Sequence, residues 1–116
     1  MTGRWTIEYY QSPSGNEPVF DFIESLPLKT KTRVYSSFEL LCDYGTHVGP
    51  PHVKKLSGTP LWELRILGEN SVRVIYITIT GRVFLLLHAC LKKKQKTPEK
   101  DIKTALARLH DYVSRH

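Results

Sequence analysis

The sequence is poor in cysteine, the residue that stabilises many small domains through disulfide bonds or bound metal ions. Its 116 residues include only two cysteines, Cys42 and Cys90, which are far apart and form no CxxC pair. Neither belongs to a zinc-binding pattern and both have apolar neighbours, so buried free thiols are the simpler interpretation. A chain of this length can bury one modest core without a disulfide or a metal. We therefore expect a single domain over residues 1–116 and no metal.

Long apolar runs are missing too. No stretch approaches the roughly 20 apolar residues that a membrane-spanning helix needs. The N-terminal segment MTGRWTIEYY does not contain the apolar core of a signal peptide. We expect a cytoplasmic protein that makes no contact with a membrane.

Acidic residues are scarce in the second half of the chain. Residues 52–116 carry thirteen Lys and Arg against five acids, a net charge of +8, whereas residues 1–51 carry −2. A one-sided positive field of this kind is typical of proteins that bind nucleic acid or an acidic partner. A basic face that is only solvated is the alternative.

Recognisable catalytic motifs are also absent. The sequence has no nucleophile elbow, glycine-rich phosphate loop, paired catalytic carboxylates or metal-ligand cluster. His47 and His52, in a loop over residues 46–52, have no acid or cysteine near them in sequence, so they predict no metal site. An enzyme of this composition is expected to work with cations or histidine, without a cofactor. RNA cleavage suits that equipment, because the substrate's 2′-OH supplies the nucleophile and the protein must only orient it, neutralise phosphate charge and move two protons.

Alternation of apolar residues and turn signals predicts four strands, at residues 4–10, 61–67, 72–79 and 83–91. The connections at residues 68–71 and 80–82 are short, which makes the last three strands antiparallel neighbours.

Helical periodicity predicts three helices. Residues 17–26 and 28–44 are separated by Pro27, which suggests a helical hairpin packed on the sheet. The buried stripe of the second helix is expected to contain Leu28, Val34, Phe38 and Leu41. Thr97 is a suitable N-cap and Pro98 a suitable first residue for the C-terminal helix. The predicted fold is α+β, in the order β-α-α-β-β-β-α, with an antiparallel sheet of about four strands.

Four motifs carry a family resemblance: KLSG at 55–58, WELR at 62–65, VRVIY at 72–76 and LHACLKKKQKTP at 87–98. Together they resemble the RelE/HigB superfamily of type II toxin–antitoxin toxins, and most closely its phage-derived branch, over roughly residues 4–110. The resemblance implies a RelE-like fold. It also implies a toxin that cuts mRNA in the ribosomal A site and is held inactive by an adjacently encoded antitoxin, in a toxin–antitoxin hetero-oligomer.

The resemblance also suggests roles for individual residues. Arg65 resembles the strand arginine that stabilises the cleaved phosphate, Lys55 is similar to a phosphate-contacting lysine, and Arg73 resembles a second arginine that either binds RNA or braces the site. The basic run after the last strand matches further RNA contacts. The expected RNA-binding set is Lys54, Lys55, Arg73, Lys92, Lys94 and Lys96, and the expected catalytic set is Arg65, His88 and Lys93.

The proton acceptor is the open point in this assignment. RelE-type toxins carry a tyrosine after the last strand, but no tyrosine lies between Ala89 and His110 here. His88 is the proposed replacement, because histidine titrates near neutral pH; Lys93 or Lys94 with a lowered pKa is the other option. Strand alternation places Leu87 and Ala89 on the face opposite His88.

Simpler interpretations stand beside these roles. His88 could be a satisfied core histidine, Arg65 could form a surface ion pair with Glu63, and Arg73 could be structural. At the level of the whole protein, the alternatives to an mRNA endonuclease are a non-enzymatic toxin like the ParE relatives, which inhibit DNA gyrase, and a decayed prophage protein that only binds its antitoxin or RNA.

Overall fold

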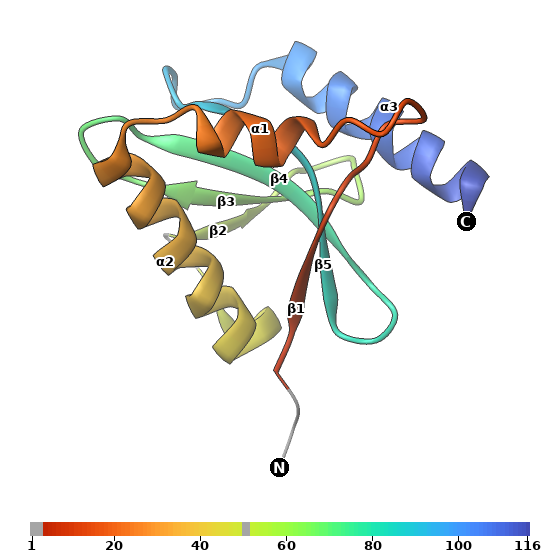
Figure 1. Ribbon diagram of the computed structural model, residues 1–116, viewed down its shortest axis with the longest axis horizontal. Coiled ribbons are helices and arrows are strands. Elements are labelled where there is room, and N and C mark those ends of the chain that lie inside the picture. Colours follow the sequence, from red (N-terminus) through yellow and green to blue (C-terminus); the bar gives the residue numbers. More distant parts are fainter. Residues whose placement is uncertain (1–3, 50–51) are drawn as a thin grey trace.

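The computed structural model describes residues 4–49 and 52–116, and it contains one mixed sheet flanked by helices (Figure 1). Pro50 and Pro51 of the predicted loop, and the first three residues, lie outside the described part. The strand order in the sheet is β1-β5-β4-β3-β2. The elements are β1 Thr6–Tyr9, α1 Pro18–Glu24, α2 Leu28–Tyr44, a 3-10 turn η1 Gly45–His47, β2 Val53–Lys55, β3 Trp62–Ile66, β4 Val72–Ile79, β5 Val83–Leu91 and α3 Glu99–Arg115.

The α+β class and the C-terminal helix are confirmed, but the sheet differs from the prediction in two ways. It has a fifth strand, β2, which pairs antiparallel with β3. In addition, β1 pairs with β5 in parallel. Hairpin turns fix the direction of β3, β4 and β5, whereas α1, α2 and three further strands separate β1 from β5 and provide the crossover that a parallel pair requires.

The sheet carries a hydrophobic core on each face. Helices α1 and α2 cover one face, where Val19 and Ile23 of α1 pack with β-strand residues, and α3 covers the other (Figure 1). Leu28, predicted to be buried, is 76% exposed because it is the first residue of α2 and precedes the buried stripe. Within the described ranges, no helix is both long and apolar enough to cross a membrane.

A β-bulge in β5 changes which side chains face α3. Ile75 pairs with His88 and Tyr76 pairs with Leu86, so Leu87 is the extra residue. Leu87 belongs to the core under α3, and the imidazole of His88 contacts α3 as well. The prediction that Leu87 faces away from His88 is therefore wrong, because a bulge interrupts the alternation. Ala89 lies in the opposite core, as expected.

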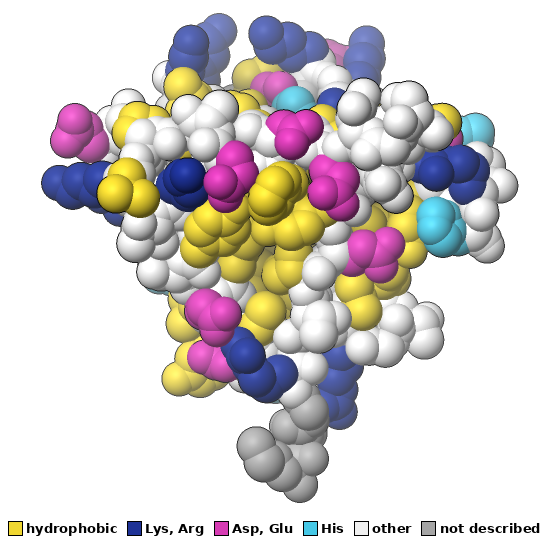
Figure 2. Space-filling model, in the orientation of Figure 1, with side chains coloured by type: hydrophobic (Ala, Val, Ile, Leu, Met, Phe, Trp, Pro, Cys, Tyr) yellow, Lys and Arg dark blue, Asp and Glu magenta, His cyan; other side chains and the backbone are white. Residues whose placement is uncertain are grey.

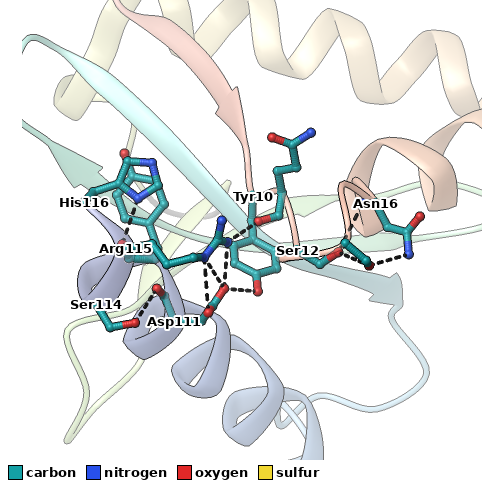
Figure 3. A network of polar contacts seen from close by, with 10 residues as sticks. Tyr10, Ser12, Asn16, Asp111, Ser114, Arg115 and His116 are labelled. Atoms are coloured by element: carbon teal, nitrogen blue, oxygen red, sulfur yellow. Dashed lines mark hydrogen bonds and ion pairs between the residues drawn. The ribbon is translucent and has the colours of Figure 1, made fainter.

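Helix α3 is held at its C-terminal end by a polar network (Figure 3). The Tyr10 hydroxyl, just after β1, donates to Asp111 Oδ2 at 2.6 Å, and Arg115 Nη2 lies 2.7 Å from the same oxygen. Arg115 Nη2 also donates to the carbonyl of Gln11. These contacts join the end of α3 to the segment that follows β1.

The close approach of α2 to the Trp5 indole requires a glycine at position 45. Gly45 has φ of 58° and ψ of −134°, and a Cβ there would overlap the Trp5 ring, which stacks on Phe84. We expect Gly45→Ala to lower the free energy of unfolding by about 1–3 kcal/mol in urea denaturation. Gly49→Ala is the control, since Gly49 has no positive φ and its Cβ would meet nothing; equal stability of the two variants would contradict this account.

Candidate functional site

The register of β3, β4 and β5 places three of the nine predicted site residues, Arg65, Arg73 and His88, on the sheet face under α3. Arg65 on β3 pairs with Arg73 on β4, which pairs with Cys90 on β5. Two residues further along β3 and β4, Glu63 pairs with Ile75, and Ile75 pairs with His88. Directly paired residues share a face of the sheet. Arg65, Arg73 and His88 are thus brought together beside residues 92–98, the connector that joins β5 to α3.

Glu63 is a fully buried carboxylate at the centre of this group. Arg65 Nε donates to Glu63 Oε2 at 2.8 Å, and Arg73 Nε lies 3.0 Å from Glu63 Oε1. The hydroxyl of Thr97 also donates to Oε1. The side chain of Glu63 is 0% exposed, so the pair with Arg65 is not the surface ion pair of the simpler interpretation. A buried carboxylate needs this compensation, because burying an unpaired charge costs several kcal/mol.

Thr97 differs from its predicted role as a helix cap. The N-cap position of α3 is Pro98, and the helix begins at Glu99 without a side-chain cap. The Thr97 hydroxyl is used for Glu63 instead. The start of α3 is therefore tied to the buried carboxylate on β3.

The buried guanidinium of Arg73 holds the connector by hydrogen bonds to its backbone. Its side chain is 1% exposed, and Nη2 donates to the carbonyl oxygens of Lys94 at 2.9 Å and Gln95 at 3.3 Å. The expectation that Arg73 contacts RNA is corrected by this placement, because β4 is an inner strand of the sheet and the connector covers the guanidinium. Of the two roles suggested for Arg73, the structure favours the bracing one.

Arg65 is the arginine of this pair that reaches the surface. Its side chain is 20% exposed, and it contacts Glu63 through Nε alone. Within the described ranges, the two terminal guanidinium nitrogens have no protein partner. A guanidinium held at Nε can still offer its terminal N–H groups to a phosphate.

The two lysines of β2 lie on opposite faces. Lys54 pairs with Glu63 and so shares the face of Arg65, whereas Lys55 pairs with Trp62 on the side of α1 and α2. Lys55 Nζ lies 5.9 Å from the Trp62 ring centroid and donates to the carbonyl of Thr59. Of the two lysines expected to bind RNA, Lys54 lies on the face of Arg65 and Lys55 does not, because neighbouring strand residues point to opposite faces.

The connector presents its lysines to solvent. Lys93, Lys94 and Lys96 are exposed, and Lys92 is half-buried with Nζ 3.4 Å from Gln95 Oε1. In Figure 2, Lys and Arg side chains project along the top of the molecule, over the connector and the start of α3, while acidic side chains surround an apolar patch over α1. On the face shown in Figure 2, the basic side chains over the connector thus lie apart from the acidic side chains around the apolar patch.

His88 is held between β5 and α3. Its Nε2 lies 2.7 Å from Asp101 Oδ1, and its Nδ1 lies 3.4 Å from Arg108 Nη1, which donates to the carbonyl of Leu87. Burial lowers the pKa of His88, against the opposing effect of Asp101. The side chain is 16% exposed and both ring nitrogens face protein groups, an arrangement that favours a structural histidine over one facing a substrate.

His88, Cys90 and Asp101 also form a group whose possible metal-ligating atoms lie within 4.8 Å of one another. The chemistry of this group suits a cation poorly. Burial raises the pKa of the Cys90 thiol to about 11, which keeps it protonated at neutral pH. The Arg108 guanidinium faces the other ring nitrogen of His88. Hydrogen bonding within the protein explains the cluster without an ion.

Sequence reasoning missed the central role of Glu63. The available signal was an acid in a largely apolar strand, two residues from an arginine on the same face. Alternation could place Glu63 beside Arg65, but not show that Arg73 and Thr97 converge on the same carboxylate.

These features define a small α+β protein with a basic sheet face organised around one buried acid. The family model described as Phage derived protein Gp49-like (DUF891) matches residues 21–110, and the chain belongs to this family. The family is one of toxin-like proteins in the RelE/HigB-like group, which also suggests an antitoxin partner. No curated protein matches the chain significantly.

The compensation of Glu63 can be tested by removing its charge. We expect Glu63→Gln to lower the free energy of unfolding by about 3–5 kcal/mol, because it leaves the buried Arg73 guanidinium without a counter-charge. Urea denaturation measures this change. Glu69→Gln, at an exposed turn, is the matched control and should stay within about 0.5 kcal/mol of the wild type. A Glu63→Gln protein as stable as this control would show that the carboxylate is not essential.

The burial of His88 predicts a pH dependence of stability. Because the folded state lowers the pKa of His88 from 6.5, the unfolded chain binds the proton more readily. The contribution of His88 is complete above the unfolded value and is lost as the pH falls from there towards the folded value. We expect the free energy of unfolding to decrease less between about pH 7.5 and pH 5 in His88→Gln than in the wild type. Identical decreases in urea titrations at both pH values would refute this.

Proposed function

We propose that this protein is the toxin of a type II toxin–antitoxin system and that it cleaves mRNA on the ribosome without a metal cofactor. The observation that carries the proposal is the state of Arg65. Its Nε is fixed by a buried carboxylate, its side chain is 20% exposed, and its terminal nitrogens have no partner among the described residues. An enzyme that acts on mRNA in the ribosomal A site would work in the cytoplasm.

The cleavage chemistry requires little of the protein beyond these groups. The substrate's 2′ oxygen attacks the adjacent phosphorus, the bond from phosphorus to the 5′ oxygen breaks, and a 2′,3′-cyclic phosphate and a 5′-hydroxyl result. Arg65 donates to the non-bridging phosphate oxygens as negative charge develops there. Lys54 and two exposed lysines of the connector, Lys94 and Lys96, contact flanking phosphates and set the position of the strand, and Lys93 beside them keeps its predicted catalytic role.

The same face is the expected binding surface of the antitoxin. An acidic segment laid across Lys54, Arg65 and the connector would compete with RNA for the same cations. Inhibition would then need no conformational change in the toxin, only occupation of the face.

One observation favours a second function. The imidazole of His88 is engaged by Asp101 and Arg108, and no tyrosine lies between Ala89 and His110, so Lys93 or Lys94 is the only acceptor left among those considered from the sequence. A non-enzymatic toxin that inhibits DNA gyrase, or a protein that only binds its antitoxin, would not need one.

The proposal is tested by primer extension on an mRNA in a purified translation system, with the same mRNA lacking ribosomes as a control. We expect ribosome-dependent cuts, and a rate about 10²–10³-fold lower for Arg65→Ala, because one charge-stabilising donor is lost. Arg4→Ala is the matched control, since Arg4 also pairs with acids, Glu39 and Asp43 of α2, but precedes β1 and lies away from the Arg65 face. Circular dichroism should show that both variants fold.

The other functions give different results in this experiment. Intact mRNA alongside growth arrest in expressing cells would replace cleavage by a gyrase-type target. Intact mRNA without growth arrest would leave a protein that only binds. Equal cleavage by Arg65→Ala and Arg4→Ala would remove Arg65 from the reaction.

A further inference from the structure

RNA cleavage at this face would need a group that removes the 2′-OH proton, and this inference rests on the proposed function. His88 is held by Asp101 and Arg108 under α3. An arginine guanidinium donates hydrogen bonds and has no acceptor atom for a proton. Besides Lys93 and Lys94 of the connector, a histidine on the face of Arg65 could supply the missing group.

The ladder between β2 and β3 places such a side chain opposite Arg65. The backbone N–H of Arg65 donates to the carbonyl of His52 at 2.7 Å, although the N–H of His52 itself bonds to Gly49 in the turn that precedes β2. Since Lys54 is paired with Glu63, the same register pairs His52 with Arg65. Directly paired side chains share a face, with Cβ atoms about 5 Å apart. His52 thus lies beside Arg65, on the open side of the sheet.

His52 and His88 differ in their exposure to solvent and in the partners of their ring nitrogens. His52 is exposed, and within residues 4–49 and 52–116 no partner of its ring nitrogens is found. His88 is largely buried and has partners at both nitrogens. In the β2–β3 ladder the charged groups on the face of His52 are Arg65, Lys54 and Glu63, and Glu63 is already compensated by Arg65 and Arg73.

We propose that His52 is the catalytic base of the cleavage reaction. The neutral imidazole accepts the 2′-OH proton as the bond from the 2′ oxygen to phosphorus forms. The bond from phosphorus to the 5′ oxygen breaks, and that oxygen takes a proton from water. The imidazolium then returns its proton to the resulting hydroxide, so that water and neutral His52 are regenerated. Arg65, directly opposite, binds the phosphate during the same step.

Single-turnover cleavage of ribosome-bound mRNA tests this assignment. We expect His52→Ala and His52→Gln to cleave at least about 10²-fold more slowly than the wild type, as loss of a general base does. Added imidazole should raise the rate of His52→Ala but not that of Arg65→Ala, because only the former lacks a proton acceptor. His110→Ala is the matched control and should cleave at the wild-type rate, since His110 is an exposed residue about 13 Å along α3 from Asp101.

The outcomes separate this inference from the proposed function. If the wild type cleaves mRNA and His52→Ala cleaves equally fast, the base is another group and the proposed function stands. If His52→Ala is folded and slow but imidazole does not accelerate it, His52 acts in binding and its role as base is overturned. If the wild type does not cleave mRNA at all, the proposed function fails and the role of His52 fails with it.

Discussion

The buried carboxylate of Glu63 is the constraint on which the functional face depends. A carboxylate placed inside a sheet must be compensated, and each group that compensates it belongs to a different part of the chain. Arg65 comes from the same strand, Arg73 from the next strand, and Thr97 from the end of the connector. One negative charge therefore fixes the partly exposed guanidinium of Arg65, the contact of Arg73 with the connector and the start of α3.

Helix α3 limits where a polyanion can reach this face. It is attached at its start through Asp101 and His88 and at its end through Asp111 and Tyr10. Both attachments cover the β5 side of the sheet, which explains why Arg73 and His88 are enclosed. The β2–β3 side remains open, and there Arg65 and Lys54 reach solvent. Which cationic side chains are buried and which can contact a polyanion thus follows from the strands that α3 covers.

Local signals explain which features could be predicted from the sequence. Short turns and apolar runs define β3, β4 and β5, and alternation places Arg65 off the apolar face. The bulge at Leu87 has no glycine or proline to mark it, so its effect on the face of Leu87 was not predictable. The three-residue strand β2 is too short for a periodic signal, and without it neither Lys54 nor Lys55 can be assigned a face. The role of Arg73 depends on the carbonyl oxygens of a distant connector, which residue types cannot specify.

The stoichiometry of the cluster explains how a buried acid can support a phosphate-binding site. Two arginines share one carboxylate, so the group keeps one excess positive charge. Arg73 directs its terminal nitrogen at backbone carbonyls, whereas the terminal nitrogens of Arg65 have no such partners. The excess charge is therefore available at Arg65, in a guanidinium whose orientation Glu63 has already fixed. A donor held in place before the substrate arrives loses less conformational freedom on binding than a free side chain would, which favours charge stabilisation at a single phosphate.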